Sequence, residues 1–136
     1  MMFKTPLTRR QVLFGPPALL FAGMVQAQVT ATGIIFAGAS WCPVCKKAAP
    51  ILAALSERLG LPVIVASADE RPIAPFAHAV PLAGHPIASA VTAYPTTFIY
   101  NAKRDAVIGS IEGYRNPTWY LTALRSFIRQ SEEVFE

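Results

Sequence analysis

The 136-residue sequence has little charge and contains neither an internal repeat nor a low-complexity tract. Only 15% of its residues are charged and 53% are hydrophobic, which argues against a disordered chain and provides enough apolar side chains for one core. The absence of repeats excludes solenoid architectures. No basic stripe interleaved with aromatic residues occurs, so nucleic-acid binding has no support. The composition predicts one compact domain.

The sequence also lacks an apolar run long enough to serve as a membrane anchor. The stretch from Val12 to Val25 is broken by glycine and proline and falls short of the about 20 residues that a spanning helix needs. Basic residues precede it, and small residues lead to Ala27. This pattern predicts a secretory signal peptide over residues 1–27, cleaved after Ala27, and a mature domain over residues 28–136 in the periplasm.

Two export routes fit this signal. The pair Arg9 and Arg10, followed by apolar residues, resembles a twin-arginine signal, whereas adjacent arginines also occur in ordinary secretory signals. Either route removes three of the basic residues. The net charge of +4 then becomes +1, from 9 basic minus 8 acidic residues in the mature domain.

Hydrophobic periodicity predicts an α/β fold in which helices flank a mixed central β-sheet. Asn116 and Pro117 have the residue types that begin a helix, and Pro50 predicts a kink within an earlier one. The expected order is a strand over 32–40, a helix over 42–59, a strand over 61–67, a proline-rich irregular loop over 72–86, a short helix over 87–94, a strand over 96–100, a turn over 101–105, a strand over 106–113 and a final helix from 117.

The only two cysteines, Cys42 and Cys45, stand three residues apart where the first strand meets the first helix. A structural disulfide there would close too small a loop to stabilise much. A zinc site would need ligands such as His78 and His85, which have no familiar finger spacing and are interpreted as loop histidines. A copper-carrying thiol pair is a third alternative.

A redox pair explains more of the pattern. Cys42 would lie at the first turn of a helix, where backbone N–H groups and the helix dipole stabilise a thiolate. Cys42 is therefore predicted to attack a substrate disulfide, and Cys45, one turn further along, to resolve the mixed disulfide.

Several motifs together resemble the thioredoxin family: "WCPVCK" after a buried strand, Pro50 in the following helix, "YPTTF" at the start of a later strand, and Gly113 before the last helix. The resemblance covers residues 29–132 and implies a thioredoxin fold. It further implies that Pro95 is a cis-proline beside the cysteine pair, although an ordinary strand-opening proline would also fit. The backbone of Tyr94 would pair with a substrate chain, and Trp41 would shield the attacking cysteine.

Two departures refine this resemblance. Cytoplasmic thioredoxin has a buried carboxylate on the first core strand, whereas no acid occurs here between Gln28 and Cys45. Val44 stands where strong periplasmic oxidants carry a histidine, so a less oxidising couple is expected. The second half of the chain resembles small periplasmic thioredoxin-like proteins encoded with conjugative-plasmid and type IV secretion genes. A periplasmic reductant of cofactor or cytochrome maturation is a second relative.

The predicted function is a thiol:disulfide oxidoreductase, either a reductase or an isomerase, that acts on disulfides of exported proteins. Its only redox group would be the Cys42/Cys45 pair, without another cofactor or a metal. The expected partners are exported substrate proteins and a membrane electron-transfer protein that keeps the pair reduced, and the chain is expected to be a monomer. The alternative is a non-catalytic thioredoxin-like module that binds a partner or copper.

Overall fold

A computed structural model describes residues 31–133 of the chain. The predicted signal peptide over residues 1–27, with its paired arginines, lies outside the described residues. Between residues 31 and 133, no helix combines the length and the apolar character needed to cross a membrane.

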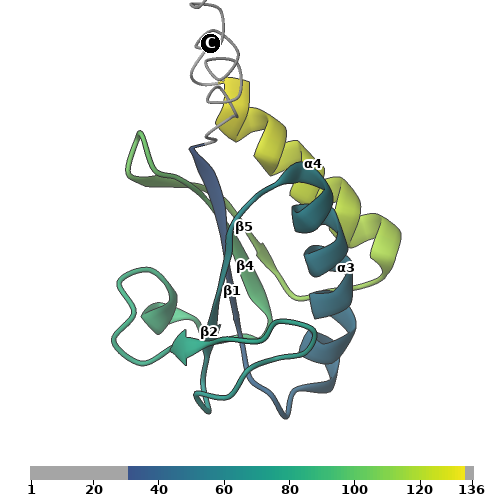
Figure 1. Cartoon of the computed structure of the whole chain (residues 1–136), viewed down its shortest axis with the longest axis vertical. Coiled ribbons are helices and arrows are strands. Elements are labelled where there is room, and N and C mark those ends of the chain that lie inside the picture. Colours follow the sequence, from purple (N-terminus) through teal and green to yellow (C-terminus); the bar gives the residue numbers. More distant parts are fainter. Residues whose placement is uncertain (1–30, 134–136) are drawn as a thin grey trace, which may run out of the picture. The chain divides into compact units, whose positions relative to one another are not determined.

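A five-stranded mixed sheet forms the centre of the fold, with the strand order β3-β2-β1-β4-β5 (Figure 1). β1 pairs in parallel with β2 and antiparallel with β4, β3 adds in parallel to β2, and β5 runs antiparallel to β4. The predicted α/β class is therefore confirmed. The strands are β1 (Thr32–Gly38), β2 (Val63–Ser67), β3 (Val80–Pro81), β4 (Thr96–Asn101) and β5 (Ala106–Glu112).

Two long helices, α3 (Pro43–Leu59) and α4 (Pro117–Glu133), pack on one face of this sheet and against each other (Figure 1). α3 includes Pro50 and ends at Gly60, whose φ of 69° is in the left-handed region that a glycine adopts without strain. α4 begins as predicted, because the side chain of Asn116 accepts a 2.8 Å hydrogen bond from the backbone N–H of Trp119.

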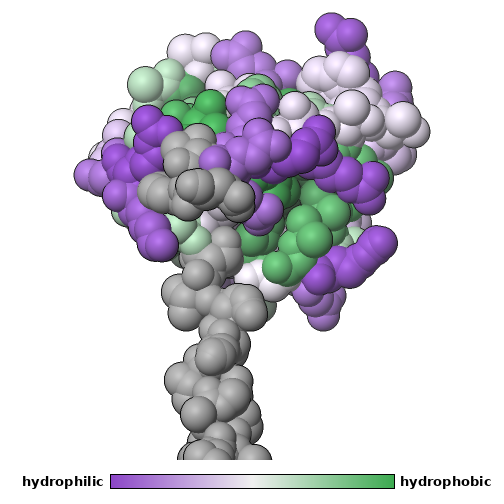
Figure 2. All heavy atoms as spheres, turned by 90° about the horizontal axis from the view of Figure 1, so that it is seen from above, coloured by the Kyte–Doolittle hydropathy of each residue, from purple (hydrophilic) through white to green (hydrophobic). Residues whose placement is uncertain are grey.

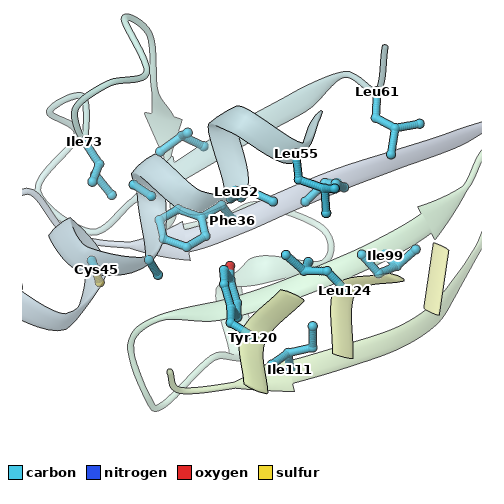
Figure 3. Packing of buried hydrophobic residues seen from close by; sticks show 14 of the residues in the cluster. Phe36, Cys45, Leu52, Leu55, Leu61, Ile73, Ile99, Ile111, Tyr120 and Leu124 are labelled. Atoms are coloured by element: carbon cyan, nitrogen blue, oxygen red, sulfur yellow. The ribbon is translucent and has the colours of Figure 1, made fainter. Parts of the chain in front are cut away.

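The main core lies between these helices and the sheet (Figure 3). Phe36 of β1, Leu52 of α3 and Leu124 of α4 are completely buried and come from three elements distant in sequence. Each side chain of this kind stabilises the fold by about 1.5–3 kcal/mol on burial. The periodicities of two in the strand and of three to four in the helices bring these side chains to one layer.

Buried polar side chains attach the end of α4 to the sheet. The hydroxyl groups of Thr32 and Ser131 lie 2.7 Å apart, and the side-chain amide of Asn101 donates to the Ser131 hydroxyl at 2.9 Å. The side-chain oxygen Oδ1 of Asn101 accepts from the backbone N–H groups of Lys103 and Arg104, which closes the predicted turn between β4 and β5. One asparagine thus holds both the hairpin and the helix.

The other face of the sheet carries a smaller apolar cluster, and here the sequence prediction was wrong. Instead of a helix over 87–94, only a single 3₁₀ turn, η2 (Ala88–Ala90), is present. The ring of His85 accepts the N–H groups of Ile87 and Ala88, which holds one isolated turn, and Val91 continues in extended backbone. So short a segment gains too few helical hydrogen bonds to propagate. β3, within the loop predicted to be irregular, is also unpredicted.

Candidate functional site

The two cysteines occupy the first turn of α3. Cys42 is the N-cap residue, and its Sγ accepts a hydrogen bond of 3.2 Å from the backbone N–H of Cys45. Pro43 needs no hydrogen-bond acceptor for its nitrogen and fits the first helical position. Both cysteines are free thiols in this structure. The Cys42 sulfur therefore lies at the donor end of the helix, where a thiolate is stabilised.

Cys45 lies behind Cys42 and is completely buried. Burial, together with the hydrogen bond to Cys42, raises the pKa of the Cys45 thiol to about 12, so this thiol is protonated at neutral pH. Its sulfur fits only because β1 ends in a glycine. A Cβ atom on Gly38 would lie 2.8 Å from the Cys45 Sγ and 3.3 Å from the Cδ1 of Ile73.

A buried pair of hydroxyl groups belongs to the same region of the core. The Tyr120 hydroxyl and the Thr97 Oγ1 lie 2.7 Å apart, and neither residue is exposed. Burial raises the pKa of Tyr120, and the negative charge of a Cys45 thiolate raises it further. Tyr120 and Cys45 share the main core cluster (Figure 3). No signal in the sequence links Tyr120 to the cysteines.

The residues predicted to shape the substrate groove lie on the outer side of the cysteine pair. Trp41 is 61% exposed, and its ring makes an edge contact with the ring of Tyr94 at a centroid distance of 6.1 Å. The Tyr94–Pro95 peptide bond is cis, as the thioredoxin resemblance implied. The carbonyl oxygen of Pro95 accepts the N–H of Gly113 at 2.7 Å, which ties this loop to the end of β5.

Asp69 is a site residue that sequence analysis missed. Its carboxylate accepts hydrogen bonds from the Ser40 hydroxyl, from the Ser40 N–H at 3.1 Å and from the Ser67 hydroxyl at 2.6 Å. These bonds, the Ser40 hydroxyl foremost, hold the pKa of Asp69 well below its usual range. The carboxylate therefore fixes the turn that leads from β1 into Cys42.

A signal for this contact was available in the strand order. β1 and β2 are parallel with Gly38 opposite Ser67, so Ser40 and Asp69 each follow a paired residue by two positions. The carboxyl ends of neighbouring parallel strands meet at the same edge of a sheet, where sites commonly form. The register, which the sequence alone does not specify, is needed to see the pair.

The two histidines weighed as metal ligands form no hydrogen bond with the cysteines in the described part of the chain and lie in different surroundings. His78 is exposed. The ring of His85 accepts hydrogen bonds from two backbone N–H groups at η2 instead of lying free in the solvent. Glu57 is exposed on α3. Within residues 31–133, no group of three histidine, cysteine or acidic side chains is arranged to hold a metal ion.

Comparisons with known proteins agree with this geometry. The family model described as TraF, F plasmid transfer operon protein, matches residues 23–111, a segment that includes both cysteines and Pro95. A search of curated proteins gives no match.

Solved structures match the chain at low identity. A chain named thiol:disulfide interchange protein DsbE, from Chlorobium tepidum, is 19% identical with a TM-score of 0.55, covering 79% of this chain and 84% of that one. A thioredoxin pre-protein of Schistosoma mansoni is 18% identical with a TM-score of 0.53, covering 79% and 89%. A thio-disulfide isomerase of Thermus thermophilus is 25% identical with a TM-score of 0.51, covering 74% and 82%. The described residues therefore have the thioredoxin fold.

Proposed function

The chain belongs to the TraF family of F plasmid transfer operon proteins, and from this premise we propose that it is a periplasmic thiol:disulfide oxidoreductase of exported proteins. The cysteine pair is its only redox group, without a metal or another cofactor. The predicted signal peptide over residues 1–27 carries it out of the cytoplasm. Its substrates are thiols and disulfides of other exported chains, on which it acts as a reductase or an isomerase.

One observation carries this proposal: two free thiols share the first turn of α3, with different environments. Cys42, with 5% of its surface exposed, lies at the N-cap with the N–H of Cys45 bonded to its sulfur, while Cys45 is completely buried in the core behind it. A structural cysteine pair needs no such difference. Disulfide exchange does, because one sulfur must meet the substrate and the other must wait behind it.

The exchange then proceeds in two steps. The Cys42 thiolate attacks one sulfur of a substrate disulfide, a mixed disulfide forms, and the displaced substrate thiolate takes up a proton. Cys45 next loses its proton to water and attacks the Cys42 sulfur, which releases the second substrate sulfur as a thiolate that takes up a proton. Two electrons have moved to the substrate, and the chain is left with a Cys42–Cys45 disulfide. A membrane electron-transfer protein of the dithiol type reduces this disulfide for the next cycle.

The exposed aromatic surface beside the cysteines forms the substrate groove. Trp41 and Tyr94 contact each other, and an extended substrate segment can pair with the backbone of Tyr94 just before Pro95. This arrangement places the substrate disulfide beside Cys42. The chain acts as a monomer in this reaction, since the groove, the attacking sulfur and the resolving sulfur come from one chain.

The reduction potential of the Cys42/Cys45 pair tests this function. Val44 supplies neither charge nor a hydrogen bond to the thiolate, so equilibration of the pair against glutathione should give about −180 to −270 mV, the range of isomerases and reductants. A value near about −120 mV would make the chain a disulfide donor instead. A Cys42→Ser variant that keeps full exchange activity would remove the proposal altogether.

A further inference from the structure

A groove runs between α3 and α4 on their solvent side, away from the cysteines. Two hollows of about 390 and 340 Å³ lie along it, and Leu55, Arg58 and Arg125 line both, so the two are continuous. Ile51 and Leu121 line one end, and Leu59 and Glu132 line the other, so both helices run in the same direction along it. This feature is called the α3–α4 groove; it is lined by Pro50, Ile51, Ala54, Leu55, Arg58, Leu59, Leu121, Arg125, Ile128, Arg129 and Glu132.

The base of the α3–α4 groove is apolar. Leu55 and Ile128 are buried there, Ile51 and Leu121 are half-buried, and Leu59 leaves 50% of its surface exposed. Figure 2, a view from above, shows hydrophobic surface in green beside hydrophilic side chains in purple on the right, the side on which α3 and α4 lie in Figure 1. An apolar surface rimmed by charged side chains is typical of an interaction site.

Three arginines border this apolar base, and one acidic residue, Glu132, lies at its end. Arg58, Arg125 and Arg129 are exposed, and none of their side chains makes an ion pair or hydrogen bond with another residue of the described part. Among residues 31–133, Glu132 is the only acidic residue that lines the groove. The border of the groove thus carries a net positive charge that the described residues do not fully compensate, and its natural complement is a partner with acidic side chains.

The shape of the groove favours a helix as that partner. From Ile51 to Leu59, α3 advances about 12 Å, which matches two to three turns of a second helix. Two helices side by side form a concave track, and an amphipathic helix fills such a track with residues spaced three and four apart. A flat lipid surface would reach the arginines but would leave the base of the track empty.

We propose that the α3–α4 groove binds an amphipathic helix of another protein. The apolar face of that helix packs on the base of the groove, and its acidic flanks pair with Arg58, Arg125 and Arg129. The interaction is independent of the thiol chemistry. It gives the chain a second surface through which it is held beside a partner while the cysteine pair remains free.

A synthetic peptide of about 15 residues, the length at which an isolated helix becomes marginally stable, is the probe. It carries leucines on one face and glutamates on both flanks, and its binding to the full chain is followed by fluorescence anisotropy. The Arg58→Ala/Arg125→Ala variant should bind it about fivefold more weakly, because each exposed ion pair contributes about a factor of two to three. Binding should weaken as salt is added.

Matched controls separate the groove from general charge. The variant Arg71→Ala/Arg104→Ala removes two exposed arginines outside the groove and should bind the peptide like the unchanged chain. A peptide with the same residues in scrambled order should bind weakly to every variant. Disulfide exchange should be the same in both double variants, which shows that they are folded.

Four results would overturn the proposal. Equal binding by the two double variants, or no binding by the unchanged chain, would exclude the groove as a helix site. Vesicles of equal parts phosphatidylglycerol and phosphatidylcholine that bind through Arg58 and Arg125, when the peptide does not, would assign the surface to a membrane. A dimer of the unchanged chain that the Arg58→Ala/Arg125→Ala variant loses, seen by sedimentation, would assign it to a second copy.

Discussion

The two sides of the cysteine turn differ in how they are built. The inner side, here called the floor, surrounds one sulfur with tightly packed core side chains and consists of Gly38, Cys45, Ile73 and Tyr120. The outer side, here called the rim, surrounds the other sulfur with hydrogen bonds, one exposed and one half-buried aromatic ring, and consists of Ser40, Trp41, Cys42, Asp69 and Tyr94.

This difference shows how two identical residues in one helical turn acquire different tasks. In the floor, burial keeps Cys45 protonated and out of reach. In the rim, the Asp69 carboxylate fixes the turn before Cys42, and the N–H of Cys45 donates to the sulfur. Packing dominates around Cys45, whereas hydrogen bonds add to the packing around Cys42, which is itself buried, so the two should respond to different substitutions.

Removal of either sulfur should have the largest effect. Cys42→Ser should abolish exchange, because the attacking thiolate is lost. Cys45→Ser should keep the first step and accumulate mixed disulfides with substrate proteins, because nothing resolves them. Exchange with a model disulfide and non-reducing electrophoresis measure the two outcomes. Mixed disulfides trapped on the Cys42→Ser variant instead would reverse the roles.

A methyl group added to the floor should have the next largest effect. Gly38→Ala places a Cβ atom 2.8 Å from the Cys45 sulfur, and this overpacking should cost about 1–3 kcal/mol of unfolding free energy. It should also slow the resolving step. Gly33→Ala, on the same strand, is the control, because its nearest neighbour would be 3.7 Å away. Chemical denaturation of both variants decides, and equal stability would contradict the packing described for the floor.

The hydroxyl pair in the floor contributes less. Tyr120→Phe leaves the buried Thr97 hydroxyl without its 2.7 Å partner, and we expect a loss of about 1 kcal/mol in unfolding free energy. Tyr100→Phe serves as the control. Its hydroxyl bonds to Asp105 at the surface, where water replaces the lost partner. A larger effect at Tyr100 than at Tyr120 would be inconsistent with a buried polar pair.

The Asp69 carboxylate of the rim should make the stability of the fold depend on pH. Because the pKa of Asp69 is depressed in the folded chain, its contribution to stability is present above the unfolded value of about 4 and is lost as the pH falls through the folded value. Asp69→Asn should therefore be less stable than the unchanged chain at neutral pH, and the difference should shrink in acid. Thermal unfolding across this range measures it. Glu70→Gln changes an exposed neighbouring residue, and its difference in stability from the unchanged chain should not shrink in the same way in acid.

Local pattern explains what the sequence could predict. The spacing of apolar residues, the Asn116 cap and the glycine after Leu59 depend on neighbours in the chain, and these features are confirmed in α3 and α4. The position of Cys42 at a helix start follows from the same local signals. The fold and the position of the cysteine turn could therefore be predicted from the sequence.

Contacts across the sheet could not be predicted from the sequence. The Ser40–Asp69 hydrogen bonds depend on the register between β1 and β2, and the Thr97–Tyr120 pair depends on how α4 crosses β4. The short helix over 87–94 was overpredicted because the backbone becomes extended at Val91 after a single turn, and apolar spacing does not show where so short a segment ends.

The order in which the two thiols react tests most directly whether Cys42 attacks and Cys45 resolves. The reduced chain is treated with a limiting amount of iodoacetamide from neutral to strongly alkaline pH, and fragment mass spectra locate the label. At neutral pH the label should fall almost entirely on Cys42, and Cys45 should react only near its pKa of about 12 or after unfolding. Labelling of Cys45 as fast as Cys42 in the folded chain at neutral pH would contradict the division between floor and rim.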